Sequence, residues 1–319
     1  MITLTAYLPD GTTKDLTANT GNYSLSDHID QLSAELKFDL TANPLDADFK
    51  DLWVPVGTKI SFTHDKVNLF QGIITKYDRN SLANFAYTAN DYAYYLNKSE
   101  IIIQFNNVTT TQAIQQLCSE NGIAIGSICD IPTIVNKIYN GSKISDVIKD
   151  LLKMAEADQK VHYYMEMREG KLWILKYSDL YIQTDTLVKN IISEFSSSYS
   201  MEDMTNKVVV ISSKEKNTQI QATAEDTDSQ QIYGTVQKVE KVDDKKVSQA
   251  QSIADGILSD KGKIKKSFSV TELGDDTVRA GRLLKFNYPE INLEGVFLVK
   301  ASTHNYSGLK HTMRLELEV

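Results

Sequence analysis

The chain has 319 residues, enough for two or three domains that each bury a core, and 41% of its residues are hydrophobic, as in an ordinary soluble protein. Its formal net charge of -8 at pH 7 argues against a surface that gains affinity by neutralising phosphates, so we expect no sequence-specific nucleic-acid partner. Two cysteines exclude a disulfide scaffold, and 15 glycines with 5 prolines leave no room for a long low-complexity linker.

The N-terminal segment, MITLTAYLPDGTTKDLT, alternates apolar and polar residues around a DG turn. It lacks the basic stretch and apolar core of a signal peptide, and the longest apolar cluster is Ile101 to Ile103. We therefore expect a strand here, folding in the cytoplasm of the producing cell, and no membrane insertion.

The first hundred residues have a period of two, which is typical of half-buried antiparallel strands. Ala34, Leu36, Phe38 and Leu40 alternate with polar residues. The segment from Asn84 runs from a strand into a short helix, with Asn90 or Asp91 as its cap. The pattern predicts an N-terminal β-barrel domain over residues 1–98.

The character of the chain changes at about residue 100. Helical spacing of apolar residues predicts one helix over 109–121 and a second over 143–157, capped by Ser142 or Ser145. A hairpin follows, with Glu169 and Gly170 at its turn. These elements predict an inserted α/β domain over residues 99–195.

The last third returns mainly to strands. Residues 207–212 (KVVVIS) predict a strand buried on both faces, residues 225–229 a polar turn, and residues 247–258 a helix. The ending MRLELEV alternates so regularly that we expect it to pair within a sheet or across a subunit boundary. We expect a C-terminal β-barrel domain with one helix over residues 196–319.

Two stretches repeat each other at a constant offset: VGTKISFTHDKVNLFQG from Val56 and AGRLLKFNYPEINLEGV from Ala280. Gly57 aligns with Gly281, 224 residues later, and the other matching positions are Phe62 with Phe286, Asn68 with Asn292 and Leu69 with Leu293. Each copy predicts strand, turn, strand. Two related β-domains with an insert between them favour an assembly protein over an enzyme, with an α+β, mainly β fold.

The histidines offer little for catalysis or metal binding. They are scattered, without the spacing of a metal motif: His28, His64, His162, His304 and His311. His304 and His311 flank a turn at Gly308 and could approach each other across a hairpin. A polar hairpin face is the simpler interpretation, and a metal site is the alternative.

Other candidate groups also have simpler explanations. Glu225, Asp226 and Asp228 only partly match a calcium loop, and carboxylate pairs such as Glu35 with Asp39 or Glu202 with Asp203 arise by chance among 42 acidic residues. A sugar-stacking platform is conceivable for four tyrosines, although rings that close a barrel are favoured: Tyr87, Tyr92, Tyr94 and Tyr95. Cys118 predicts a buried free thiol, and Cys129 has no motif partner. We expect no catalytic, cofactor or metal site.

Several blocks of the sequence resemble the baseplate hub proteins of contractile phage tails, as found in PBSX-like defective prophages and related to late control D proteins. They are GTKISF through NLFQGII, then ANDYAYYLNKS, TTQAIQQLCSENGIAIGSI, MEDMTNKVVVIS, and the ending from VRAGRLLKF to HTMRLELEV. The likeness covers most of the chain.

The resemblance implies a homotrimer in which two tube-like barrels per subunit form a six-fold-like ring. Such a ring would match a hexameric tail tube and receive a trimeric central spike, with the α/β insert directed toward baseplate wedge or spike proteins; the tape measure protein is a further candidate partner. It implies no enzyme and no cofactor, and a place in the baseplate of a phage or a DNA-free bacteriocin particle. The alternative function is a cell-wall carbohydrate-binding or wall-degrading module.

Overall fold

The computed structural model describes residues 1–41, 53–79, 81, 83–182, 193–212 and 219–318. They form two compact units: Met1–Phe195 together with Ser269–Val319, and Ser196–Phe268. The predicted α+β, mainly β class is confirmed. The domain boundaries at residues 98 and 195 stay predictions. No helix in the described ranges is long and apolar enough to cross a bilayer.

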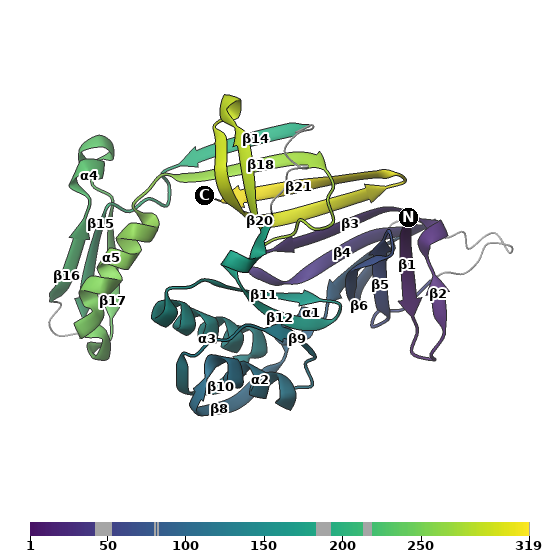
Figure 1. The fold of residues 1–319 in the computed structure, drawn as a ribbon, viewed down its shortest axis with the longest axis horizontal. Coiled ribbons are helices and arrows are strands. Elements are labelled where there is room, and N and C mark those ends of the chain that lie inside the picture. Colours follow the sequence, from purple (N-terminus) through teal and green to yellow (C-terminus); the bar gives the residue numbers. More distant parts are fainter. Residues whose placement is uncertain (42–52, 80, 82, 183–192, 213–218, 319) are drawn as a thin grey trace. The chain divides into compact units, whose positions relative to one another are not determined.

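Strands from both ends of the chain belong to one sheet (Figure 1). The N-terminal strands are β1 (Ile2–Tyr7), β2 (Thr13–Asp15), β3 (Thr20–His28), β4 (Gln31–Thr41), β5 (Lys59–His64), β6 (Val67–Arg79) and β7 (Asn84–Asp91), with a 3-10 turn, η1 (Thr17–Asn19). The later strands are β13 (Tyr181–Ile182), β14 (Glu194–Ser200), β18 (Lys265–Leu273), β19 (Leu283–Tyr288), β20 (Leu293–Ser307) and β21 (Lys310–Glu318).

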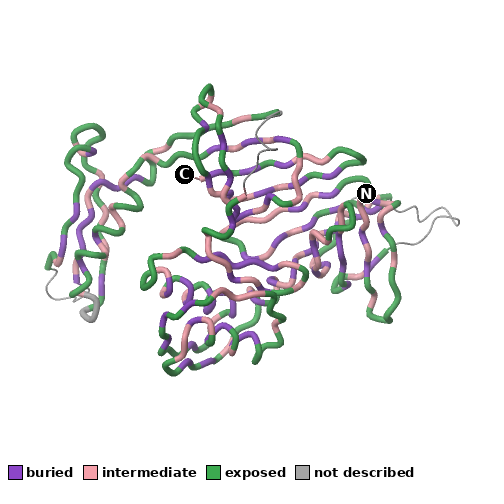
Figure 2. The backbone as a smooth tube through the Cα atoms, in the orientation of Figure 1, coloured by how far each residue is buried: buried purple, intermediate pink, exposed green. Residues whose placement is uncertain are grey.

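The order along the sheet is β14-β18-β21-β20-β3-β4-β7-β6-β5-β1-β2, with β19 paired to β20 and β13 to β19. The two ends of the chain meet where β20 pairs antiparallel with β3, which sets His304 opposite Leu25. Buried and solvent-facing residues alternate along these strands, as Figure 2 shows. The predicted pairing of the C-terminal strand is confirmed, because β21 pairs with β20 over nearly its whole length.

The repeated sequences form equivalent hairpins, β5–β6 and β19–β20, so both strand-turn-strand predictions are confirmed. Gly57 and Gly281 each precede the first strand with positive φ angles of 90° and 82°. The amide of Gly57 donates to the carbonyl of Ile74 and that of Gly281 to the carbonyl of Val299, each at 2.8 Å. Both copies therefore begin with a backbone conformation that glycine adopts readily and other residues adopt rarely.

The turns of the two hairpins differ. Asp65 and Lys66 both have positive φ in the first, as a two-residue primed turn requires. The second turns through η5 (Pro289–Ile291) and ends at Asn292 with a φ of 56°.

The α/β region contains α1 (Ala93–Lys98), β8 (Glu100–Thr109), α2 (Thr110–Glu120), β9 (Ile125–Ile128), β10 (Ile134–Lys143), α3 (Ile144–Gln159), β11 (Tyr163–Arg168), β12 (Lys171–Lys176) and η2 (Tyr177–Leu180). Strand β8 pairs with β10, and β12 lies between β11 and β9. The apolar faces of α2 and α3 share one core with residues from β8, β10, β11 and β12. Both predicted helices and the hairpin are therefore confirmed.

Details of the helix ends depart from expectation in two places. Thr109 and Gln112 form a capping box at the start of α2. The N-cap of α3 is Lys143, without a side-chain bond, so the predicted cap at Ser142 or Ser145 was wrong. The N-cap of α1 is Tyr92, also without a side-chain bond, so the predicted cap at Asn90 or Asp91 was wrong, although Asp91 accepts from the amide of Ala93 at 3.0 Å.

The second unit is a small sheet covered by a helix. It contains β15 (Lys207–Ser212), β16 (Ile220–Glu225), α4 (Thr227–Tyr233), β17 (Gln237–Val242), η4 (Asp244–Gln249) and α5 (Ala250–Lys261). Strand β15 lies between β16 and β17, and the successive residues Val208, Val209 and Val210 are all buried, which confirms the predicted burial on both faces. Ala250 and Ala254 of α5 pack on Val208 and Val210. The polar turn expected at 225–229 is instead the start of α4, because Asp226 accepts from the amide of Ser229 and caps a helix.

Candidate functional site

A buried polar network surrounds the loop of residues 274–282, which connects β18 to β19. Arg279 donates from Nε to Oδ2 of Asp27 at 3.1 Å, and the amide of Ala280 donates to Oδ1 at 3.1 Å. Ser302 of β20 also donates to Oδ1. Asp27 of β3 therefore satisfies donors from the loop and from β20, as a buried carboxylate requires.

The same loop is attached to the α/β region through a second ion pair. Nη2 of Arg282 donates to both oxygens of Glu166 on β11, at 3.3 and 3.0 Å, and both side chains are less than 10% exposed. Arg168 also pairs with Glu166. Beside them, a Cβ built on Gly281 would lie 2.5 Å from the ring of Tyr164. The loop backbone therefore packs against this ring at a distance that a residue without a side chain allows.

The network sets the protonation of its members. Burial alone would lower the pKa of Arg279, but the carboxylates of Asp27, Glu166 and Asp91 more than offset it, so the pKa is raised and the guanidinium keeps its charge. Burial raises the pKa of Asp91 to about 7, against the lowering effect of its hydrogen bonds. The charged guanidinium of Arg279 and the carboxylate of Asp27 therefore hold the loop.

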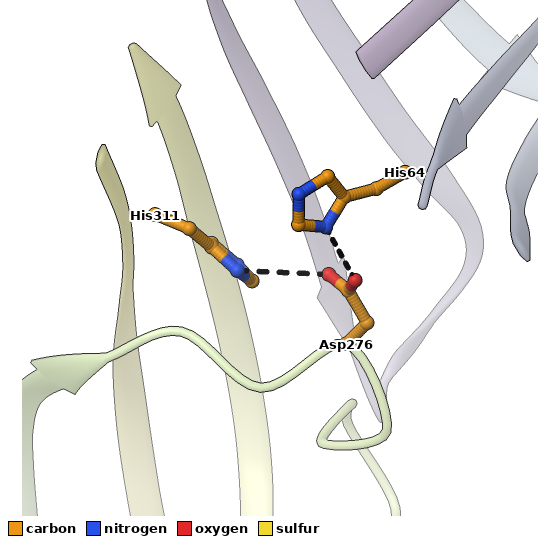
Figure 3. Close-up of side chains that lie close together, drawn as sticks. All are labelled: His64, Asp276 and His311. Carbon is orange, nitrogen blue, oxygen red and sulfur yellow. Dashed lines mark hydrogen bonds and ion pairs between the residues drawn. The ribbon is translucent and has the colours of Figure 1, made fainter. Parts of the chain in front are cut away.

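A histidine and carboxylate cluster lies beside this network (Figure 3). Nδ1 of His64, at the end of β5, is 2.6 Å from Oδ2 of Asp276 in the loop. Nδ1 of His311 on β21 is 3.7 Å from Oδ1 of the same carboxylate. Tyr306 of β20 donates to Oδ1 at 2.7 Å and stacks on His311 with ring centroids 4.1 Å apart.

His304 also belongs to this cluster. Its Nε2 is 2.8 Å from the carbonyl oxygen of Val278, and its Nδ1 is 3.0 Å from Nε2 of His311. Burial lowers the pKa of His304. Burial and then the neighbouring His304 lower the pKa of His311 to about 4, so both rings are neutral at neutral pH.

The structure brings together three of the five histidines. His304 and His311 approach across their hairpin, as was expected for residues flanking one turn. His64 and Asp276 come together from 212 residues apart, and no short-range pattern in the sequence indicates it. His28 and His162 lie elsewhere, each beside a carboxylate on the surface: Asp30 and Glu156 respectively.

The aromatic candidates do not share one exposed surface. Tyr87 is 1% exposed and stacks on Phe38, with ring centroids 5.1 Å apart. Tyr92 packs against the α/β core, while Tyr95 is 45% exposed and Tyr94 lies against it edge-on. Tyr87 belongs to the core of the sheet and Tyr92 packs on that of the α/β region. The interpretation favoured from the sequence, rings that close a barrel, stays a prediction.

The acidic candidates and cysteines also have individual explanations. Glu35 pairs with Lys37 and Glu225 with Lys207, and Asp226 is a helix cap. Asp39, Asp228, Glu202 and Asp203 are exposed. Cys118 is a buried free thiol, as predicted, and Cys129 is free and half-buried.

Known proteins are similar to this chain in sequence and in fold. The phage-like element PBSX protein XkdQ of Bacillus subtilis strain 168 is 28% identical over 273 residues, which cover 83% of this chain and 82% of that protein. The 43 kDa tail protein of prophage MuSo2 from Shewanella oneidensis superposes with a TM-score of 0.72 at 13% identity, over 99% of this chain and 97% of that one.

A more distant structure has the same fold. The Escherichia coli c3393 protein, described as a type VI secretion component with structural similarity to the T4 tail proteins gp27 and gp5, has a TM-score of 0.51 at 8% identity, over 94% of this chain and 73% of its own. A family model described as YQBQ-like matches residues 23–318. The chain therefore belongs to the YQBQ-like family.

Proposed function

We propose that this protein is a structural component of a phage tail or phage-tail-like particle, and specifically the hub of its baseplate. Three copies would form a ring between the hexameric tail tube and the trimeric central spike. The observation that carries the proposal is the pair of similar hairpins in one chain, each started by a glycine of positive φ whose amide donates to a carbonyl of the second strand. A trimer would present six such hairpins, which is what a six-fold tube needs from a three-fold partner.

The comparisons support this proposal at the level of the fold. The MuSo2 protein is a phage tail protein, and the c3393 protein is related in structure to tail proteins gp27 and gp5. The relative from Bacillus subtilis comes from a phage-like element.

Buried ion pairs connect separate parts of the chain, as suits an adapter that must be rigid. Asp27 and Arg279 connect the two halves of the sheet, and Glu166 and Arg282 connect the insert to them. Buried pairs of this kind fix one arrangement because breaking either leaves an unpaired charge. We propose that the function rests on such rigidity and on surfaces, without a catalytic step.

The insert offers a surface for a partner. Ile102 of β8 is 77% exposed, and Ile134 and Ile138 of β10 are 53% and 63% exposed, on the face of this two-stranded sheet that points away from its core. We propose that wedge or spike proteins cover this face, and that the tube and the tape measure protein are further partners. The protein would assemble in the bacterial cytoplasm and then occupy the baseplate of the particle, whether or not that particle carries DNA.

Co-expression with the tube and spike proteins of the same particle tests the proposal. Light scattering and electron microscopy of the purified complex should give three copies of this chain in a ring between the two partners. An Ile138→Arg variant should still form the ring but lose partners of the insert. A chain that stays monomeric with both partners present would refute the hub assignment. Sedimentation with purified cell walls would then test the carbohydrate-binding alternative.

A further inference from the structure

The geometry points to a zinc site formed by Nδ1 of His64, a carboxylate oxygen of Asp276 and Nδ1 of His311. The ligand atoms of these three residues all lie within 4.8 Å of one another, and both imidazole rings approach the carboxylate of Asp276 in Figure 3. Zinc binds nitrogen and carboxylate oxygen at about 2.0–2.1 Å, so the atoms of a tetrahedral site are about 3.3 Å apart. Side-chain shifts of about 1 Å would close the present arrangement around an ion. The inference does not depend on the proposed place in a baseplate.

The hydrogen-bond chain behind His311 prepares it as a ligand. A backbone carbonyl only accepts, so Nε2 of His304 must donate to Val278, which leaves Nδ1 of a neutral His304 as an acceptor. That acceptor faces Nε2 of His311 at 3.0 Å, so His311 carries its hydrogen on Nε2. Nδ1 of His311 therefore presents a lone pair to the carboxylate of Asp276, itself an acceptor, at 3.7 Å. Two acceptors cannot hydrogen-bond to each other, and a cation between them would satisfy both.

The groups around the three ligands have the positions of a second coordination shell. Tyr306 donates to Oδ1 of Asp276 at 2.7 Å and so orients the carboxylate. Nε2 of His64 lies 3.8 Å from Oδ2 of Asp65, while its Nδ1 faces the site. Metal-binding histidines usually give their second nitrogen to a carboxylate or another acceptor, as His311 does to Nδ1 of His304 at 3.0 Å.

The ligand chemistry selects the metal. Two imidazoles and one carboxylate suit zinc, whereas calcium and magnesium prefer sites made only of oxygen. The side chains of His64, Asp276 and His311 are 22%, 23% and 12% exposed, so water can reach the fourth position. Arg279, a cation close by, is paired with Asp27. The carboxylate of Asp276 gives the site a negative charge, which favours a cation.

A metal here would clamp three separate parts of the chain: β5 of the first hairpin, the 274–282 loop and β21. Binding to a site formed only in the folded chain raises stability by mass action. At a free zinc concentration a hundred times the dissociation constant, we expect a rise of about 5 °C in the midpoint of thermal unfolding.

The test uses the full-length chain, treated with a chelator and then titrated with zinc chloride. Calorimetry and elemental analysis after gel filtration should give one zinc per chain. His64→Ala and Asp276→Asn should abolish this binding, while His162→Ala, which removes an exposed histidine outside the cluster, should not. Circular dichroism shows whether each variant is folded.

Cobalt(II) gives a readout on the unmutated chain, which avoids relying on a variant that fails to fold. Bound cobalt should show the strong visible bands of a four-coordinate site, and zinc should displace it. The inference is overturned by weak bands like those of hydrated cobalt, by the absence of stoichiometric zinc, or by folded His64→Ala and Asp276→Asn variants that keep the metal.

Discussion

Arg279 donates to Asp27 across 252 residues of sequence, at 3.1 Å, with both side chains largely buried. Asp27 belongs to a strand from the first part of the chain and Arg279 to the loop that precedes the second copy of the repeated hairpin. This pair holds the two β-regions in register where β3 meets β20.

Arg279→Leu should lower the free energy of unfolding by about 3 kcal/mol, because it leaves the charge of Asp27 buried without its partner. The double variant Asp27→Asn with Arg279→Leu should recover part of this loss, since neither charge remains. Urea unfolding of the four proteins in the cycle measures the coupling. As a control, Asp78→Asn breaks the exposed pair with Lys76 and should cost less than about 1 kcal/mol. Equal losses of unfolding free energy on breaking the buried pair and the exposed pair would contradict a role for burial in the strength of the Asp27–Arg279 pair.

The glycines that begin the two hairpins provide a matched comparison. Both have positive φ, but a Cβ on Gly57 would meet nothing within 4 Å, whereas on Gly281 it would strike the ring of Tyr164. Gly57→Ala should therefore cost about 1 kcal/mol of stability, for the backbone alone. Gly281→Ala should cost about 3 kcal/mol because steric overlap is added. Thermal unfolding of the two variants checks this, and equal losses would contradict the close approach of β11 to the loop.

Glu272 makes stability depend on pH. It is buried on β18, Oε1 has no hydrogen-bond partner, and burial, then the charge of Asp275, raises its pKa to about 7. The folded chain thus holds this proton more tightly than the unfolded chain, so the contribution is fully present below pH of about 4.5 and is lost as pH rises through 7.

Glu272→Gln is permanently neutral and should be more stable than the parent at pH 8 by about 3 kcal/mol, with most of the difference gone at pH 5. Denaturant titrations at both pH values measure it. The exposed Glu294→Gln is the control and should shift neither value. A difference between parent and Glu272→Gln that does not change with pH would mean that the carboxyl is already ionised in the folded chain.

The two thiols should differ in reactivity. Burial raises the pKa of Cys118 to about 12, and its side chain has no exposed surface in α2. Cys129 is half-buried, and the lowering effect of Lys176 partly opposes burial in setting its pKa. A maleimide reagent should therefore modify Cys129 first and reach Cys118 only when the chain unfolds. Mass spectrometry of a time course, with Cys129→Ala as the control, tests the order.

Local patterns predicted the elements well because their causes are local. Capping by Thr109 and the alternation in β21 act over a few residues, and the repeated glycines mark identical backbone requirements at Gly57 and Gly281. The error at 225–229 was also local, since Asp226 suits a turn and a helix cap equally.

The candidate site was largely hidden from the sequence. His304 and His311 could be expected to meet because one hairpin turn separates them. The approach of His64 to Asp276, and of Asp27 to Arg279, depends on the pairing of β3 with β20, which joins segments far apart in the chain. Pairing of that kind is set by the packing of the whole unit, so no spacing of residues reports it.

The most direct test of the proposed function is an electron cryomicroscopy reconstruction of this chain bound to its tail tube and spike. The account predicts three copies, with hairpins β5–β6 and β19–β20 alternating around one ring and each facing one subunit of the hexameric tube. A ring of six copies, or a ring in which only one of the two hairpins contacts the tube, would contradict it.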